Sequence, residues 1–148
     1  QKISERVGTE EGVGDWFEIT QDMINEFADL THDHQFIHVD EAAAQSVGFP
    51  TTIAHGFLTL SMLTHLAASI PQDPELLKGV AMGMNYGFDK VRFIAPVPNG
   101  SRVRCRAELK SADLKGDAIN LTRTYTMEIE GSDKPALAAD WIVRLVFA

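Results

Sequence analysis

One run of residues constrains the fold of this chain more than any other. Residues 55–70 read H-G-F-L-T-L-S-M-L-T-H-L-A-A-S-I and are followed by Pro71, which ends the run. They are apolar around most of the circumference of a helix, a pattern typical of a helix wrapped by other structure rather than lying on a surface. At 1.5 Å per residue the helix is roughly 24 Å long. We therefore expect one long central helix with a sheet curled around it.

The second half of the chain has the period of β-strands. Arg102, Arg104 and Arg106 alternate with small apolar residues, and the last strand alternates in the same way. One apolar helix followed by an antiparallel meander predicts an α+β fold, with the sheet packed on one face of the buried helix. The expected strands are residues 80–93 (long and bent, with Gly83 and Gly87 inside), 101–109, 119–129 and 137–147, with a turn at 95–100 and reversals at Gly116 and Gly131.

Before the central run, the pattern predicts two short helices. Thr20 is a good N-cap for a helix that runs to about Leu30, and Asp40 is a good N-cap for residues 41–47, which Gly48 terminates. Residues 1–12 carry no pattern and predict a loose start, 15–19 predict a short strand, and 49–54 an extended crossing. The two helices thus form an insertion between the first strand and the central helix.

Length and composition set limits on function. The 148 residues fit a single domain, 1–148. A net charge of -8 leaves no surplus of cations for phosphates, which argues against a general nucleic-acid binder. Cys105 is the single cysteine, so a reducing, cytoplasmic location is the simpler expectation. No apolar run approaches the roughly 20 residues of a membrane span.

The insertion carries an unusual density of proton-handling groups. Residues 27–40 read F-A-D-L-T-H-D-H-Q-F-I-H-V-D. Asp33 and His38 are five residues apart, so one straight helix would not present them together, but a loop between two helices could turn both toward one point. A carboxylate and an imidazole that share a water molecule form an acid–base device. We expect Asp33 to activate the water, and His38 to orient it and return a proton to carbon.

Such a pair needs an electrophile held nearby, and the start of the long helix offers a way to hold one. The first N–H groups of a helix have no partner within the helix and carry partial positive charge. Gly56 has no side chain, so a substrate carbonyl could approach its N–H directly and develop negative charge there.

Three stretches resemble one family. The pattern F-A-x-x-T-x-D-x-Q-x-I-H-x-D of residues 27–40, A-H-G-F at 54–57 and N-Y-G-F-D-K-V-R-F-x-A-P-V at 85–97 are similar to the (R)-specific enoyl-CoA hydratases of the MaoC-like family. The resemblance implies a hot-dog fold, a homodimer built by sheet pairing, and hydration of trans-2-enoyl-CoA to (R)-3-hydroxyacyl-CoA. It assigns the catalytic Asp to Asp33, the catalytic His to His38 and the carbonyl-binding N–H to Gly56.

The chain departs from the family pattern at two places. His32 stands where the family usually has Gly, and a β-carbon resists some conformations that Gly permits. Gln35-Phe36 replaces the family's Asn-Pro.

The resemblance implies an acyl-CoA thioester as substrate and no cofactor, because coenzyme A is part of the substrate.

Further candidates have an ordinary alternative beside the functional one. Gln35 could hold the water or the substrate, or make a plain loop hydrogen bond, and Asn85 could bind the ligand or serve the bend of its strand. Lys90 and Arg92, or some of the three alternating arginines, could contact the phosphates of coenzyme A, although such arginines usually form a solvated strand face.

For the pair itself, Asp33 could merely satisfy N–H groups of the loop. His32 and His34 are expected to be solvated or to support the catalytic groups without touching the substrate, and His55 to be a helix cap or a buried, hydrogen-bonded residue. No bound metal is expected, because neither H-E-x-x-H nor a Cys/His spacing occurs.

Two other functions remain open at this point. A hot-dog acyl-CoA thioesterase would release free thiol instead of consuming the enoyl double bond. A non-catalytic acyl-thioester-binding subunit would bind ligand tightly while Asp33→Asn left turnover unchanged. The sequence does not distinguish coenzyme A from acyl-carrier-protein thioesters.

Overall fold

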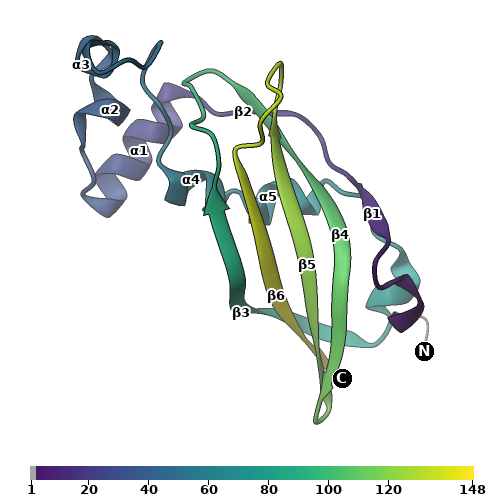
Figure 1. The fold of residues 1–148 in the computed structure, drawn as a ribbon. Helices are drawn as coiled ribbons and strands as arrows, with labels where there is room; N and C mark the ends of the chain where they lie inside the picture. The colour runs from purple at the N-terminus through teal and green to yellow at the C-terminus, as the bar shows by residue number, and fades with distance from the viewer. Residues whose placement is uncertain (1–2) are drawn as a thin grey trace.

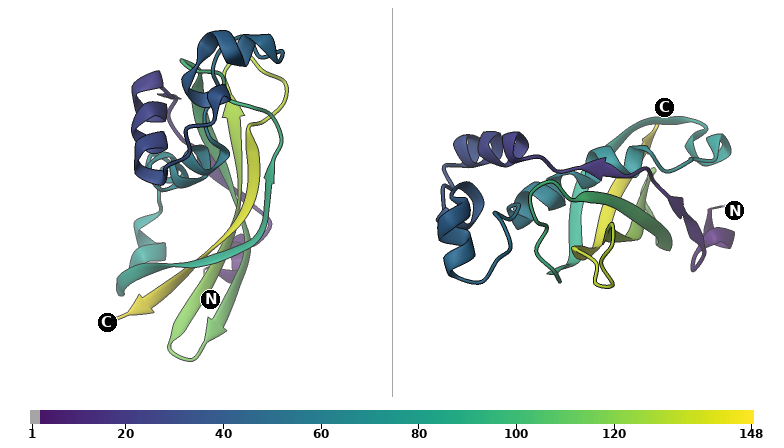
Figure 2. Two further views of the ribbon diagram at one scale, coloured as in Figure 1. Left: turned by 90° about the vertical axis from the view of Figure 1, so that its left-hand side faces the viewer. Right: turned by 90° about the horizontal axis from the view of Figure 1, so that it is seen from above.

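Six strands form one antiparallel sheet in the computed structural model, which describes residues 3–148. The strand order is β1-β4-β5-β6-β3, and β2 pairs with β4 beside β1. Helices lie on one face of this sheet, and α1, α2 and α3 gather at one end of it (Figures 1 and 2). The strands are β1 (Glu10–Val13), β2 (Phe17–Glu18), β3 (Val80–Phe93), β4 (Arg102–Lys115), β5 (Ala118–Ile129) and β6 (Leu137–Phe147).

The expected strands of the second half are confirmed, with one difference in length. β3, β5 and β6 agree with the expected bounds to within one residue, and Gly116 and Gly131 occupy the reversals with positive φ. β4 extends to Lys115, six residues beyond the expected end at 109. The pairing of β4 with β5 shifts register between Leu109 and Ser111. Because this bulge interrupts the alternation of side chains, the sequence pattern stops there while the strand continues.

The first residues contain more structure than expected. A short 3-10 helix, η1 (Ser4–Arg6), precedes β1, which pairs with β4, so the prediction of a loose start is wrong for the described part of 1–12; residues 1 and 2 lie outside the described residues. The strand expected at 15–19 contracts to β2. Pairing with β4 creates β1, and E-E-G-V alone has no alternation to reveal it.

The central helix is broken. It consists of α4 (Gly56–Ser61) and α5 (Leu63–Ala68), separated at Met62, whose ψ is −9°. The expectation of one continuous helix is therefore wrong. The Ser61 hydroxyl donates to the carbonyl of Phe57, a side-chain bond to the preceding turn of the kind that bends helices.

One face of α4 and α5 packs on the sheet and the other does not. Leu58, Leu63 and Leu66 are buried, whereas Phe57 is 70% exposed. A single chain therefore covers the helix on one side only. The inward side chains of the sheet complete the core with the helices; they include Val103, Cys105, Ala107, Tyr125, Met127, Ile129, Leu137 and Ala139.

The insertion has the expected helices and one more. α1 (Gln21–Thr31) begins after Thr20, whose hydroxyl accepts from the Met23 N–H, and α3 (Glu41–Ser46) begins after Asp40, whose carboxylate accepts from the Ala43 N–H. Between them lies α2 (Phe36–Val39), and a second 3-10 helix, η2 (Pro74–Leu77), follows α5. Among the described helices, none is both long and apolar enough to cross a membrane.

Candidate active site

The chain reverses sharply where α1 ends. His32 has φ 60° and ψ 26°, the left-handed conformation in which Gly is favoured, and it is the only non-glycine residue with positive φ among residues 3–148. The N–H of Asp33 donates to the carbonyl of Ala28 at 3.1 Å. The reversal leads into Asp33, which lies beside His38 and His55, and His32 adopts at this reversal the strained conformation that Gly would take more readily.

His38 lies on α2, not in the loop where the sequence placed it. Its side chain is 6% exposed, and its Nδ1 lies 2.6 Å from the carbonyl oxygen of Ile53. Because a carbonyl can only accept, Nδ1 carries the hydrogen and Nε2 of the neutral ring has a free lone pair. The short helix and this bond together fix the direction of the ring.

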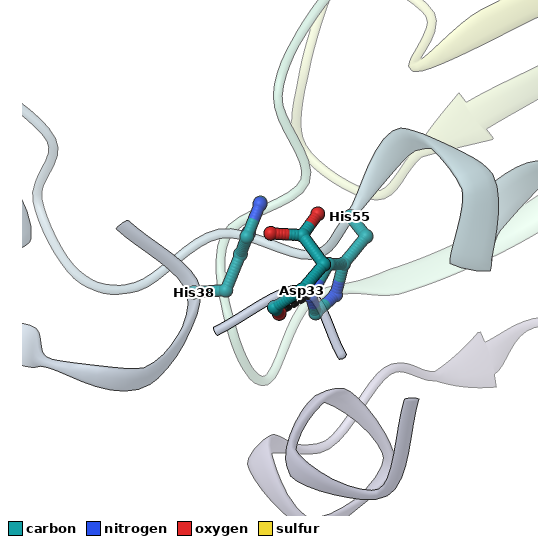
Figure 3. Close-up of side chains that lie close together, drawn as sticks. All are labelled: Asp33, His38 and His55. Atoms are coloured by element: carbon teal, nitrogen blue, oxygen red, sulfur yellow. Dashed lines mark hydrogen bonds between the residues drawn. The ribbon is translucent and has the colours of Figure 1, made fainter. Parts of the chain in front are cut away.

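Asp33 and His38 meet. The carboxylate of Asp33, a nitrogen of His38 and a nitrogen of His55 all lie within 4.8 Å of one another. Figure 3 shows the carboxylate pointing to the His38 ring. The same carboxylate accepts from the N–H of Gln35 at 3.3 Å, and it is exposed, whereas His38 is buried. The pair thus joins a solvated carboxylate to a buried imidazole.

Burial lowers the pKa of His38 below its ordinary value of 6.5, because the charged ring would be poorly solvated. The bond to the Ile53 carbonyl and the nearby Asp33 carboxylate oppose this shift, and the neighbouring His55 reinforces it. The net direction keeps His38 neutral near pH 7, with Nε2 able to accept a proton.

A pocket of about 250 Å³ opens beside the pair. His38 and Gly56 both line it, and its other walls are Ile53, Ala54, Thr59, residues 93–97 and Ala136. The N–H of Gly56, the first residue of α4, has no hydrogen-bond acceptor among residues 3–148. A β-carbon at Gly56 would lie 3.0 Å from the ring of Phe93, which is tighter than ordinary packing. Glycine therefore keeps the amide open and lets Phe93 form the pocket wall.

Comparison with known proteins identifies the family. Residues 2–130 match the model of the MaoC like domain. The chain belongs to the MaoC-like family. It is 47% identical over 145 residues to 3-hydroxyacyl-thioester dehydratase Z of Mycobacterium tuberculosis, covering 97% of this chain and 93% of the relative. It is 51% identical over 149 residues to nodulation protein N of Rhizobium meliloti, covering 98% and 89%.

Solved structures confirm the fold of this MaoC-like chain. R-hydratase PhaJ1 from Pseudomonas aeruginosa superposes with a TM-score of 0.70 at 20% identity, over 96% of this chain and 83% of that chain. The (R)-hydratase from A. caviae gives a TM-score of 0.67 at 23% identity, over 88% and 94%. The fold is the hot-dog fold expected from the resemblance. As a MaoC-like protein, the chain is a hydro-lyase, a hydratase or dehydratase.

The remaining predicted residues of this MaoC-like site are not all brought to the pair. Gln35 lies next to it as the N-cap of α2, but through its main chain, which donates to Asp33. Asn85 lies on β3 in a separate pocket of about 150 Å³. There its side-chain oxygen accepts from the indole N–H of Trp141 at 2.8 Å.

Lys90 and Arg92 lie on the outer face of the sheet. Val91 and its register partner Ala139 pack into the core, so the residues on either side of Val91 point away from it. Lys90 lines an outer pocket with Lys110 and Asp140, and the guanidinium of Arg92 donates to the carbonyl of Val91. Within one chain, neither cation reaches the pocket beside His38.

The three alternating arginines are on that outer face too, and acidic partners neutralise them. Arg102 pairs with Glu130, Arg104 with Glu128, and Arg106 with Glu10 and Glu128. These pairs fit the solvated strand face better than a phosphate site.

Asp33, His38 and His55 have the donor types of a zinc site, but their geometry does not suit a shared ion. The two imidazoles are stacked, with centroids 3.8 Å apart and planes inclined by 24°. Ring lone pairs lie in the ring plane, so one ion could lie in the plane of only one of the rings. The donors therefore fit a hydrogen-bonded cluster better.

His55 is the residue whose place in the site the sequence did not indicate. It was expected to be a cap or a buried, hydrogen-bonded residue; it occupies the N-cap position of α4 without a side-chain cap bond, and it is buried. Its Nε2 lies 3.0 Å from the main-chain oxygen of Asp33. A histidine directly before the open Gly56 amide was the available signal.

Proposed function

We propose that the protein is an (R)-specific enoyl-CoA hydratase, which adds water reversibly to trans-2-enoyl-CoA and yields (R)-3-hydroxyacyl-CoA in fatty-acid metabolism. The observation that carries the proposal is the meeting of Asp33 and His38 within 4.8 Å beside a pocket that Gly56 lines. A water molecule that donates to two acceptors at about 2.8 Å spans about 4.5 Å between them. The relative named 3-hydroxyacyl-thioester dehydratase supports the same chemistry in the reverse direction.

The tautomer of His38 decides how the proton moves. The water donates one hydrogen to the Asp33 carboxylate and the other to the Nε2 lone pair of His38. As the water oxygen bonds to C3 of the enoyl group, the C2–C3 π electrons move toward the thioester and form an enolate. One proton leaves the water and reaches Nε2, directly or by way of Asp33. His38 then returns it to C2, so one water is added in total and both residues regain their starting states.

The enolate needs a donor for its oxygen, and Gly56 supplies one. Its N–H begins α4 and has no acceptor among residues 3–148. A hydrogen bond aimed at a developing oxyanion typically lowers the activation barrier by about 3 kcal/mol. The buried Ile53–Ala54 segment on one side and Phe93 on the other leave the amide facing the pocket. The thioester itself acidifies C2, so the proposed reaction uses no cofactor and no metal.

The proposed assembly is a cytoplasmic homodimer formed through β3. This strand pairs with β6 on one side and is at the edge of the sheet on the other. Its first half exposes three large apolar or aromatic side chains, Met82 at 55%, Met84 at 49% and Tyr86 at 56%. An exposed apolar edge is a template for pairing with another strand, and a second copy of β3 would cover both the edge and these side chains.

A purified-protein assay tests the reaction. Crotonyl-CoA and longer trans-2-enoyl-CoA thioesters are supplied, and loss of the conjugated double bond is followed by absorbance while free thiol is measured in parallel. We expect the absorbance to fall without thiol release and the product to be the (R)-enantiomer. Thiol release without prior hydration would establish a thioesterase instead, and tight binding with no turnover would establish a binding subunit.

A further inference from the structure

Three residues before α4 hold both members of the catalytic pair. The carbonyl of Ile53 accepts from Nδ1 of His38 at 2.6 Å, and the N–H of Ile53 donates to the carbonyl of Ile37 at 3.0 Å. The Nε2 of His55 donates to the main-chain carbonyl of Asp33 at 3.0 Å. The segment 53–55 is thus the common anchor for a loop and a helix that carry the two groups separately.

His55 is held tightly at this anchor. Its side chain is 2% exposed. One face of its ring stacks on His38, with centroids 3.8 Å apart, and Phe27 of α1 packs against it at 5.0 Å and 58°. Figure 3 shows the ring behind Asp33, between the carboxylate-bearing loop and α4.

The polar atoms of His55 show that packing alone does not explain a histidine here. Because the carbonyl of Asp33 can only accept, Nε2 carries the hydrogen and Nδ1 is an acceptor. Nδ1 is buried without a hydrogen-bond partner in the described part of the chain. Burying a polar atom without a partner is unfavourable, because the atom loses its hydrogen bonds to water and gains none in return. An apolar ring would avoid that cost, but it would lack the N–H that reaches Asp33.

We propose that His55 is the positioning residue of this active site: its Nε2–H fixes the main chain of Asp33, and its ring face fixes the orientation of His38. The inference rests on the proposed hydratase function for its catalytic consequence. His55 reaches no reacting atom in this arrangement, because its one hydrogen is committed to Asp33 and its ring lies against His38. Its contribution is to keep the two acceptors at the separation that one water molecule can span.

Two matched substitutions separate positioning from packing. In His55→Gln the amide nitrogen is the same number of bonds from the main chain as Nε2, so it can still donate to Asp33. In His55→Asn the amide nitrogen is one bond shorter and cannot. Asn is a favoured N-cap residue, so His55→Asn keeps the start of α4. The readouts are kcat and KM for crotonyl-CoA, the melting temperature, and amide hydrogen exchange at Asp33 and Gln35.

We expect His55→Gln to keep kcat within about tenfold and His55→Asn to lose about 100-fold, since a misplacement of 1 Å can cost that much. KM should change little in either variant, and the two melting temperatures should agree within a few degrees. Amide exchange at Asp33 and Gln35 should quicken in His55→Asn only. Equal kcat values for the two variants, or losses that follow the melting temperature, would overturn the inference.

The exchange measurement keeps this inference separate from the hydratase proposal. If the wild type hydrates no enoyl thioester, the proposed function fails, and the exchange rates alone decide whether His55 anchors Asp33. Faster exchange in His55→Asn than in His55→Gln then supports the anchor, and equal exchange rejects it. If His55→Asn does not fold, His55→Phe replaces it, because Phe keeps the ring faces but lacks the N–H.

Discussion

The Nδ1 of His38 and the carbonyl oxygen of Ile53 lie 2.6 Å apart, and this contact decides which nitrogen of the imidazole is free for chemistry. A ring that donates through Nδ1 presents a bare Nε2 to the Asp33 carboxylate and to any water between them. The tautomer is therefore fixed by the main chain of the segment before α4.

The lowered pKa of His38 predicts how activity depends on pH. The neutral ring is the form that can accept a proton from water, and burial keeps it neutral to a pH below the ordinary 6.5. We expect kcat/KM to stay level from pH 8 to 6.5 and to fall only below that, through the pKa of folded His38. A pH–rate profile with a loss of activity beginning above pH 7 would contradict this assignment.

The same shift predicts a change in stability. Below pH 6.5 the unfolded chain takes up a proton at His38 before the folded chain does, so the free energy of unfolding falls as pH falls toward the folded pKa. Urea unfolding at pH 7.5 and 5.5 measures it. His38→Gln, which has no titrating group, should lose this part of the pH dependence, while the contributions of other groups remain.

Removing either catalytic group should lower kcat strongly. Asp33→Asn and His38→Ala should each reduce kcat for crotonyl-CoA hydration by at least about 100-fold, the lower end of the contribution of general acid–base catalysis. Asp29→Asn is the matched control, because Asp29 is an exposed carboxylate of α1 that pairs with His34 outside the site. Its kcat should equal that of the wild type; full activity of Asp33→Asn would remove the basis of the mechanism.

Gly56→Ala should damage the site by overpacking. The new β-carbon would lie 3.0 Å from the ring of Phe93, which must shift by a few tenths of an ångström to accommodate it. We expect a stability loss of about 1–3 kcal/mol, measured by urea unfolding, and a fall in kcat. Phe93→Leu gives the shape control: the double variant should recover part of both losses, so the two substitutions should be non-additive.

His32→Gly should stabilise the protein. Holding a residue with a β-carbon in the left-handed conformation destabilises the folded state by about 1–2 kcal/mol. The greater freedom of Gly in the unfolded chain offsets about 0.4–1 kcal/mol of the gain from removing that strain. The net gain expected in the free energy of unfolding is about 0.5–1 kcal/mol. His34→Gly, at an exposed position without positive φ, should lower stability instead. Equal effects of the two substitutions would show that His32 is not strained.

A charge on the free edge of the sheet should disrupt the proposed homodimer. Met84→Lys places a cation on β3, where edge strands use Lys to prevent pairing. Sedimentation velocity should show a shift from dimer to monomer. Leu114→Lys is the control, because Leu114 is exposed on β4, which β5 and β6 separate from β3. This variant should leave the dimer intact. A wild-type monomer would reject the dimer directly.

Local patterns were sufficient for part of this structure. The alternation around Cys105 and Tyr125 predicted the inner face of the sheet, since inward positions need apolar side chains. Thr20 and Asp40 predicted the helix starts because capping is a local interaction. The aspartates and histidines of residues 27–40 indicated Asp33 and His38 as the candidate pair, and the family resemblance supported that prediction.

Features that depend on distant contacts could not be read in this way. The strand character of residues 10–13 comes from pairing with β4, and the break at Met62 has neither Gly nor Pro to announce it. The role of His55 depends on Asp33, which is 22 residues earlier in the chain. The outward direction of Lys90 and Arg92, by contrast, can be predicted from the sequence, because both residues flank Val91, whose apolar side chain marks the inward position.

The anchor segment leads directly into Gly56, so one continuous stretch of backbone, residues 53–56, both holds the proton-handling pair in place and presents the open amide. The opposite wall of the pocket, including Ile94 and Ala136, belongs to the sheet half of the chain. That wall of the cavity is therefore encoded in a different half of the sequence from the proposed reaction chemistry. Mutations that resize the cavity at Ile94 or Ala136 can accumulate without rebuilding the machinery that moves the proton, and this separation leaves substrate preference open to evolutionary change.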